Sequence, residues 1–177
     1  MNLFGSGAAE LVRVKDVVAE AGLTERYFYE SFSDLDALFG AVSDIVIQDI
    51  ETEVNAAVQK APEDDLASVS IALRTSVEKL VGDPRMIQII FAADPSRGGR
   101  AGLRRSETRL RAARTLLGRS GARGCSLGDN PEARIKALAL SGAASELLIS
   151  RAEGLLEITA DELTDFLVGL YRQMNFP

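Results

Sequence analysis

The feature of this 177-residue chain that most constrains its fold is one long apolar stripe in residues 33–60. Apolar side chains recur there every three or four residues, which is the spacing of one face of an α-helix. Ser33 is placed to cap this helix, Asp34 and Asp36 lie in its first turn, and Pro62 ends the pattern. The stripe predicts a rod that joins a small head to the rest of the chain. It consists of Leu35, Leu38, Phe39, Val42, Ile45, Val46, Ile50, Val54, Ala57 and Val58.

The remaining sequence also favours helices. Ala, Leu, Glu and Arg recur, runs of alternating β-branched and polar residues are missing, and 46% hydrophobic content is enough for one sizeable core. We therefore predict an all-α fold, with residues 1–42 as a small helical head and residues 43–177 as a larger helical domain. Further helices are predicted at about 63–81, 84–92, 101–119, 131–153 and 160–174.

Two short helices are predicted before the rod. In VRVKDVVAEAGL, valines recur at helical spacing from Val14, and Gly22 supplies the stop typical of a helix C-terminus. Thr24 can begin the next helix, its hydroxyl accepting from backbone N–H groups. Two helices joined by a tight turn form a helix-turn-helix, whose second helix can lie in the major groove of DNA. Such hairpins also occur in proteins that never contact DNA.

The stretch GLTERYFYESF places three aromatic residues in succession, although aromatic residues make up only 6% of the chain. At about 100° per residue, Phe28 falls on one face of the second helix together with Phe32. Arg26 and Glu30 face the opposite way, and Tyr27 and Tyr29 flank them. The pattern therefore predicts that Phe28 is a core residue and that the two tyrosines border a polar surface.

The longer string VRVKDVVAEAGLTERYFYESFSDLDALFGAV, residues 12–42, resembles the TetR family of transcriptional regulators. This resemblance implies a DNA-binding head, a long connecting helix, and a variable domain for ligand binding and dimerisation. It also implies site roles: Thr24 and Tyr29 would contact the DNA backbone, and Lys15 could contact a phosphate. Glu25, Arg26 and Tyr27 would face base edges, with Arg26 suited to guanine O6 and N7. For each residue the alternative is an ordinary surface side chain.

The resemblance further implies a homodimer formed by the last two helices, which binds double-stranded DNA and responds to a small molecule. Small residues at 141–145 would let helices approach closely, although packing within one subunit is the alternative. An effector pocket between the middle helices would be largely apolar, and its lining residues are equally good core residues. The predicted lining is Leu73, Leu80, Met86, Ile89, Ile90 and Phe91.

Two departures from the family pattern bear on DNA binding. The family's head has three helices, but only twelve residues precede the helix expected from Arg13, so LFGSG at 3–7 resembles the tail of a truncated first helix. Residues 13–42 contain three basic and six acidic side chains, which gives a local net charge of −3. Because phosphate neutralisation supplies much of the affinity for DNA, we expect weak and salt-sensitive binding.

Composition excludes several classes of function. The chain has no histidine and one cysteine, Cys125, which excludes histidine-based catalytic triads, imidazole zinc sites and an internal disulfide. We expect no enzymatic activity, no metal and no cofactor. No secretory signal or long apolar run is present, so we expect a cytoplasmic protein with no membrane contact. The alternative function is a dimeric ligand-binding or partner-binding protein that has lost DNA binding through its truncated head.

A last feature is the segment 97–123, which contains nine arginines and one acidic residue, Glu107. The simplest interpretation is a solvated amphipathic helix whose arginines pair with acids elsewhere. The alternative is a site for an anionic ligand, an acidic partner or nucleic acid.

Overall fold

A computed structural model of the chain describes residues 3–5, 12–62, 64–91 and 130–174, and within these ranges all regular structure is helical. The predicted all-α fold is confirmed. The predicted helix at about 101–119, and the arginine-rich segment that contains it, lie outside the described residues. The helices are α1 (Val14–Ala21), α2 (Glu25–Ser31), α3 (Leu35–Val58), α4 (Asp65–Gly82), α5 (Pro84–Phe91), α7 (Pro131–Ala152) and α8 (Ala160–Gln173).

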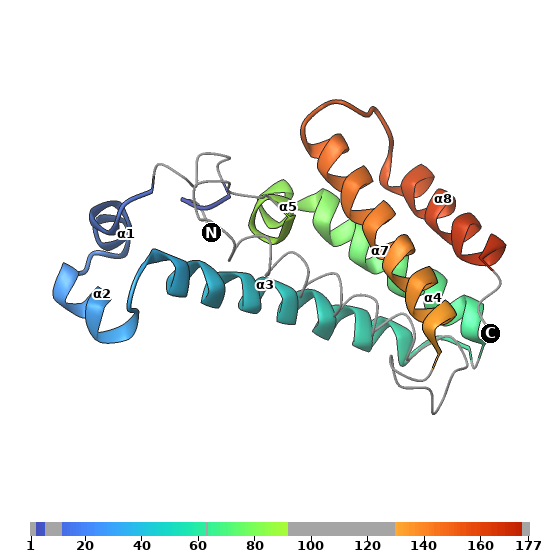
Figure 1. Cartoon of the computed structure of the whole chain (residues 1–177), viewed down its shortest axis with the longest axis horizontal. Helices are drawn as coiled ribbons and strands as arrows, with labels where there is room; N and C mark the ends of the chain where they lie inside the picture. The colour runs from blue at the N-terminus through green and yellow to red at the C-terminus, as the bar shows by residue number, and fades with distance from the viewer. Residues whose placement is uncertain (1–2, 6–11, 63, 92–129, 175–177) are drawn as a thin grey trace.

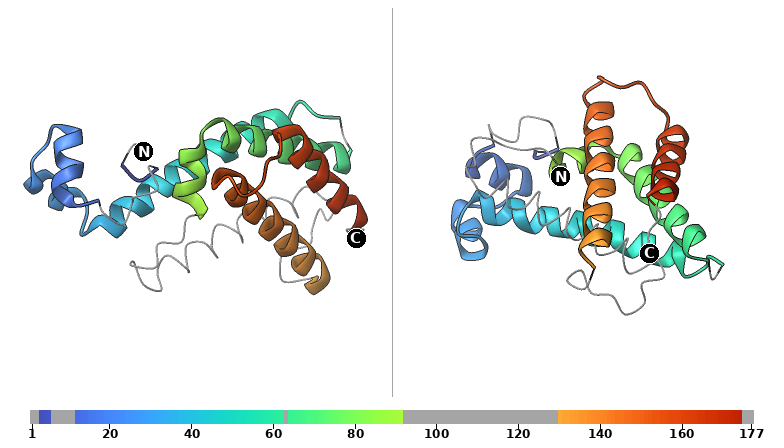
Figure 2. Two further views of the ribbon diagram at one scale, coloured as in Figure 1. Left: turned by 90° about the horizontal axis from the view of Figure 1, so that it is seen from above. Right: turned by 45° about the vertical axis from the view of Figure 1, so that its right-hand side comes forward.

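The 24 residues of α3 form the spine of the molecule, about 36 Å long at 1.5 Å per residue. Figure 1 shows the pair α1–α2 at one end of this spine and α4, α7 and α8 towards the other. The two views in Figure 2 show the same separation. The prediction that a rod joins a small helical pair to a larger unit is therefore confirmed. We call the larger unit the body: α4, α5, α7, α8 and the part of α3 that packs on them.

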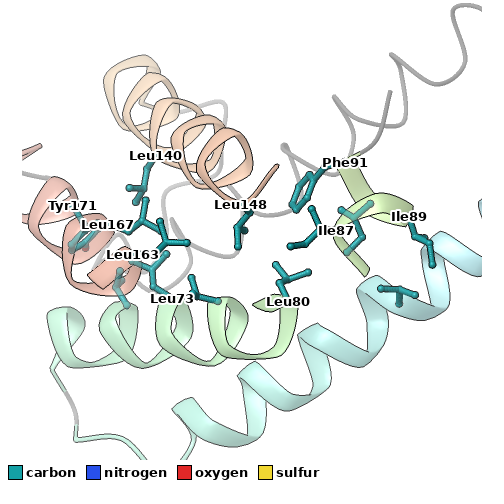
Figure 3. Close-up of a cluster of buried hydrophobic side chains, with 14 of the residues drawn as sticks. Leu73, Leu80, Ile87, Ile89, Phe91, Leu140, Leu148, Leu163, Leu167 and Tyr171 are labelled. Atoms are coloured by element: carbon teal, nitrogen blue, oxygen red, sulfur yellow. The ribbon is translucent and has the colours of Figure 1, made fainter. Parts of the chain in front are cut away.

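The body has one apolar core between its helices. Helix α4 packs against both α3 and α8, while α5 lies against α3 and α7. Leu140 of α7 and Leu163 and Leu167 of α8 have no exposed surface, and Figure 3 shows them gathered with Leu73 of α4. The helices thus bury most of the apolar faces that their periodicity predicted, although Ile45 of the predicted stripe on α3 is 66% exposed.

Residues 3–5 form a turn that is packed onto the body. Phe4 is only 4% exposed and meets the ring of Phe39 edge-to-face, with ring centroids 5.4 Å apart. Gly5 lies against α5, where a Cβ atom would stand 2.4 Å from the Cβ of Arg85. The chain is therefore anchored to α3 and α5 before it reaches α1.

Charged side chains join the helices of the body at two places. Arg74 of α4 donates to Asp161 of α8 at 2.6 Å and lies 3.5 Å from Asp165. Lys79 of α4 bonds to Glu53 and, at 3.0 Å, to Asp49, both on α3. These hydrogen bonds, that to Glu53 first, raise the pKa of Lys79 above its ordinary value. The two clusters link α4 to α8 on one side and to α3 on the other.

None of the helices described is both long enough and apolar enough to cross a lipid bilayer.

Candidate nucleic-acid interface

The turn between α1 and α2 depends on one glycine. Gly22 adopts φ 65° and ψ 30°, the left-handed conformation that residues with a Cβ atom rarely adopt. This geometry lets the Leu23 N–H donate to the Val18 carbonyl at 2.8 Å and the Gly22 N–H to the Ala19 carbonyl at 3.2 Å. Helix α2 begins only three residues after Gly22, so the predicted helix-turn-helix is present.

The aromatic triplet divides as the helical spacing predicted. Phe28 is 5% exposed and contacts Phe32, with ring centroids 5.9 Å apart. Tyr27 and Tyr29 are 57% and 58% exposed. The ring of Tyr29 also packs edge-to-face on Phe28, with ring centroids 5.2 Å apart. Phe28 therefore anchors α2, and both tyrosines are accessible from outside.

Two predicted caps are wrong. Thr24 does occupy the position before α2, but its hydroxyl accepts no capping hydrogen bond; only its carbonyl is used, by the Phe28 N–H at 3.3 Å. The long helix is capped by Asp34 instead of Ser33, because the Asp34 carboxylate accepts from the Ala37 N–H at 2.7 Å. A carboxylate is the stronger acceptor at a helix N-terminus, whose N–H groups carry partial positive charge.

The predicted DNA-contacting residues are all exposed. Lys15 lies on α1, Thr24 precedes α2, and Glu25, Arg26, Tyr27 and Tyr29 belong to α2 or its first turn. The structure thus brings five of the six onto one short helix and its cap. Their contacts with DNA stay a prediction.

Sequence reasoning missed the partner of Arg26. Its Nε donates to the Glu30 carboxylate at 2.9 Å, while the two side chains remain 86% and 51% exposed. A signal was available, since side chains four residues apart on a helix lie next to each other.

Several of the acidic residues in this region have local structural roles. The Asp16 carboxylate accepts from the Arg13 N–H at 2.9 Å at the start of α1, Asp34 caps α3, and Glu30 holds Arg26. The net negative charge of this region is unfavourable for DNA binding. It arises in part because acidic side chains cap its helices and pair with Arg26.

The predicted effector-lining residues lie in the body. Leu73 and Leu80 are on α4, and Ile89, Ile90 and Phe91 are on α5; all five belong to the buried core, with Met86 packed against it. Figure 3 shows Leu80 and Phe91 near each other, whereas Ile89 lies on the side of α5 nearer α3. Contact with an effector stays a prediction for these residues.

Helices α7 and α8 pack on each other within the chain. Leu148, Leu163 and Leu167 are buried there, as are Ser141 and Ser145. Other apolar side chains on the same two helices face outwards: Ile135 is 67% exposed and Phe166 is 55% exposed. The large apolar side chains of α7 and α8 therefore serve mainly for packing within the chain, while Ile135 and Phe166 remain exposed.

Comparison with known proteins adds information on the fold. No protein-family model and no curated protein matches the chain. The fold is similar to that of a protein of unknown function from Rhodococcus sp. RHA1, with a TM-score of 0.61 and 17% sequence identity. The match covers 92% of this chain and 84% of that chain. At this identity the similarity concerns the helical architecture alone.

Proposed function

We propose that this chain is a TetR-like transcriptional regulator, a ligand-responsive repressor that binds a palindromic operator as a homodimer. Helix α2 would lie in the major groove, with Tyr29 and Thr24 at the DNA backbone. Arg26, Tyr27 and Glu25 would face base edges, and Lys15 a phosphate. The proposal includes no catalytic step.

The observation that carries this proposal is the exposure of α2. A helix-turn-helix pair stands at the far end of α3, and the one buried aromatic residue of α2, Phe28, leaves the opposite face of the helix accessible. Arg26, Tyr27 and Tyr29 occupy or border that face. A helix supported from one side and accessible on the other has the geometry needed to enter a groove about 12 Å wide.

In a dimer, two such helices would meet successive major grooves, about 34 Å apart. The exposed apolar side chains Ile135 of α7 and Phe166 of α8 would pair with their copies. A small apolar effector bound beside the core of the body would act by favouring a dimer whose two α2 helices no longer match this spacing.

Fluorescence anisotropy tests the proposal. The purified chain is titrated into duplex DNA from the region upstream of its own gene, across a salt series, with unrelated DNA as competitor. We expect selective binding that weakens steeply between about 50 and 200 mM salt, because phosphate contacts release counterions. Equal affinity for both DNAs at every salt concentration would refute the proposal.

In the same assay, Tyr29→Phe should weaken binding by about 2- to 10-fold on every sequence, the effect of losing one hydrogen bond. The substitution keeps the ring contact with Phe28, so the fold of α2 is preserved. Tyr27→Phe is the matched control, because Tyr27 is equally exposed but would face bases. A Tyr29→Phe effect confined to one operator base pair would contradict the assigned phosphate contact.

A second candidate function is a dimeric ligand-binding or partner-binding protein that does not bind DNA. The observation that favours it is the local net charge of −3 in residues 13–42, together with Leu23, which is 54% exposed beside the turn. Such a surface suits a basic, partly apolar protein partner better than a polyanion. Absence of DNA selectivity at low salt would favour this candidate.

A further inference from the structure

The exposed pair formed by Arg26 and Glu30 is not explained by the stability of α2. In an isolated helix the favourable order places the acid N-terminal to the base, and here the order is reversed. Arg26 lies in the first turn, where the helix end is partly positive, and Glu30 lies near the last turn, where it is partly negative. Ion pairs this exposed also add little to folding stability.

The geometry of the pair leaves a specific set of donors free. A guanidinium has five N–H groups, one on Nε and four on the two terminal nitrogens. Glu30 occupies Nε at 2.9 Å, the edge of the guanidinium nearest the helix. Within the described residues, Arg26 makes no other hydrogen bond. Both of its terminal nitrogens therefore remain available for a pair of acceptors in one plane.

Guanine offers such a pair, because its O6 and N7 atoms both accept hydrogen bonds at the major-groove edge. A phosphate also accepts from arginine, and a phosphate contact carries no sequence information. The Glu30 carboxylate disfavours the phosphate, since its negative charge stands 2.9 Å from the guanidinium that the phosphate would approach. An uncharged base edge is repelled much less.

We infer that Glu30 is a specificity-determining positioning residue. It holds Arg26 by Nε and directs the two terminal nitrogens to guanine instead of the DNA backbone. This inference rests on the proposed function, and it adds a named preference: a guanine in each half-site, opposite Arg26. In this role Glu30 lowers the affinity for DNA of any sequence and raises the selectivity for sites that contain the guanine.

The test uses duplexes of about 30 base pairs with randomised centres, long enough for two half-sites one helical turn apart. The purified wild-type chain, Arg26→Ala, Glu30→Ala and Glu30→Gln each select from this pool at low salt, and base preferences are read by sequencing. Glu132→Ala is the matched control, because it removes the acid of another exposed pair four residues apart, with Lys136 at 2.6 Å on α7. Far-ultraviolet circular dichroism verifies that each variant is folded.

We expect the wild-type chain to prefer guanine at one position of each half-site by about fivefold or more, the range of a bidentate arginine contact. Arg26→Ala should abolish this preference. Glu30→Ala should bind the unselected pool more tightly and lose at least about half of the preference, while Glu30→Gln should bind more tightly and keep most of it, because its amide oxygen still accepts from Nε. Glu132→Ala should behave as the wild-type chain.

The outcomes separate the two ideas. If the wild-type chain enriches no sequence, the proposed function and this inference both fail. If it enriches a motif whose guanine preference is the same in Glu30→Ala as in the wild-type chain, the inference alone is wrong and Glu30 only repels phosphates. A motif that Arg26→Ala leaves unchanged also overturns the inference and leaves the regulator proposal standing.

Discussion

Gly5 is a residue at which the structure leaves no room for a side chain. A Cβ atom there would lie 2.4 Å from the Cβ of Arg85 and 3.1 Å from its Cα. These are atoms at the base of the side chain and in the backbone, so they cannot rotate away as the tip of a long side chain can. The Arg85 side chain is further held by Asp83, to which its Nε donates at 2.8 Å. Only glycine fits here without displacing α5 or the turn.

We predict that Gly5→Ala lowers the free energy of unfolding by about 1–3 kcal/mol, the usual cost of overpacking. Urea denaturation followed by circular dichroism measures this as a lower midpoint. The control is Gly82→Ala at the end of α4, where a Cβ atom would meet nothing within 4 Å. That control should be neutral or stabilising by up to about 1 kcal/mol, since alanine favours helix. Equal midpoints for Gly5→Ala and the wild-type chain would mean that residues 3–5 do not stay packed on α5 in solution.

The sequence did not reveal this anchor. LFGSG has no helical period, and its resemblance to the tail of a helix gave no sign that Phe4 would pack on Phe39, 35 positions later. Contacts between segments far apart in sequence have no local pattern. The partner of Arg26, by contrast, lies within one helical turn and was open to prediction.

At the scale of helices, local patterns were sufficient. Seven of the predicted helices are confirmed in the residues that the structure describes, because apolar periodicity and the Gly and Pro breaks lie within the segment they shape. The ends were less predictable. Ser33 and Asp34 are both good capping residues, and the helix begins at the position where the Asp34 carboxylate, the stronger acceptor, can accept from the Ala37 N–H. The sequence could not distinguish residues that line an effector pocket from residues of the core, because both kinds of position need apolar side chains.

Three carboxylates near helix ends should make the stability of the fold depend on pH in the acid range. The pKa of Glu162 is lowered by hydrogen bonds from the Thr159 N–H and hydroxyl, that of Asp83 by the side chain of Arg85, and that of Glu132 by Lys136. A carboxylate whose pKa is lowered by folding stabilises the folded state. This stabilisation is complete at pH values above the ordinary pKa, which is 3.8 for Asp and 4.5 for Glu. It is lost as the pH falls through the lowered pKa of the folded state.

We therefore predict that the melting temperature falls as pH drops below about 4.5. For Lys79 the sign is opposite: its raised pKa adds stability that is complete below 10.5 and is lost as pH rises through the folded value. Between about pH 5 and pH 8 the curve should be nearly flat, because the chain has no histidine to titrate there. Differential scanning calorimetry across this range measures the curve; a steep change near pH 6.5 would contradict the prediction.

For the whole molecule, the proposed dimer depends on the exposed apolar side chains Ile135 of α7 and Phe166 of α8. We predict that the wild-type chain sediments at twice its mass of 19.0 kDa and that Phe166→Glu, at a side chain 55% exposed, shifts it towards the monomer. A charge buried between two copies would lack a partner, which is costly. The control is Leu155→Glu, in the loop after α7 at 76% exposure, which should leave the mass unchanged. Analytical ultracentrifugation at micromolar concentration decides; a monomeric wild-type chain would refute the dimer.

The length of α3 has a mechanical consequence. In the C-terminal half of this helix Lys79 holds Asp49 and Glu53 to α4, and at the N-terminal end the chain turns into α2. From Glu53 to Leu35 the helix extends about 27 Å, so a rotation of about 7° at the body carries its N-terminal end through about 3 Å. That distance is close to the 3.4 Å rise between neighbouring nucleotides of one DNA strand. A side-chain rearrangement in the core, too small to alter the fold, would thus be magnified into a displacement of about one base step at α2.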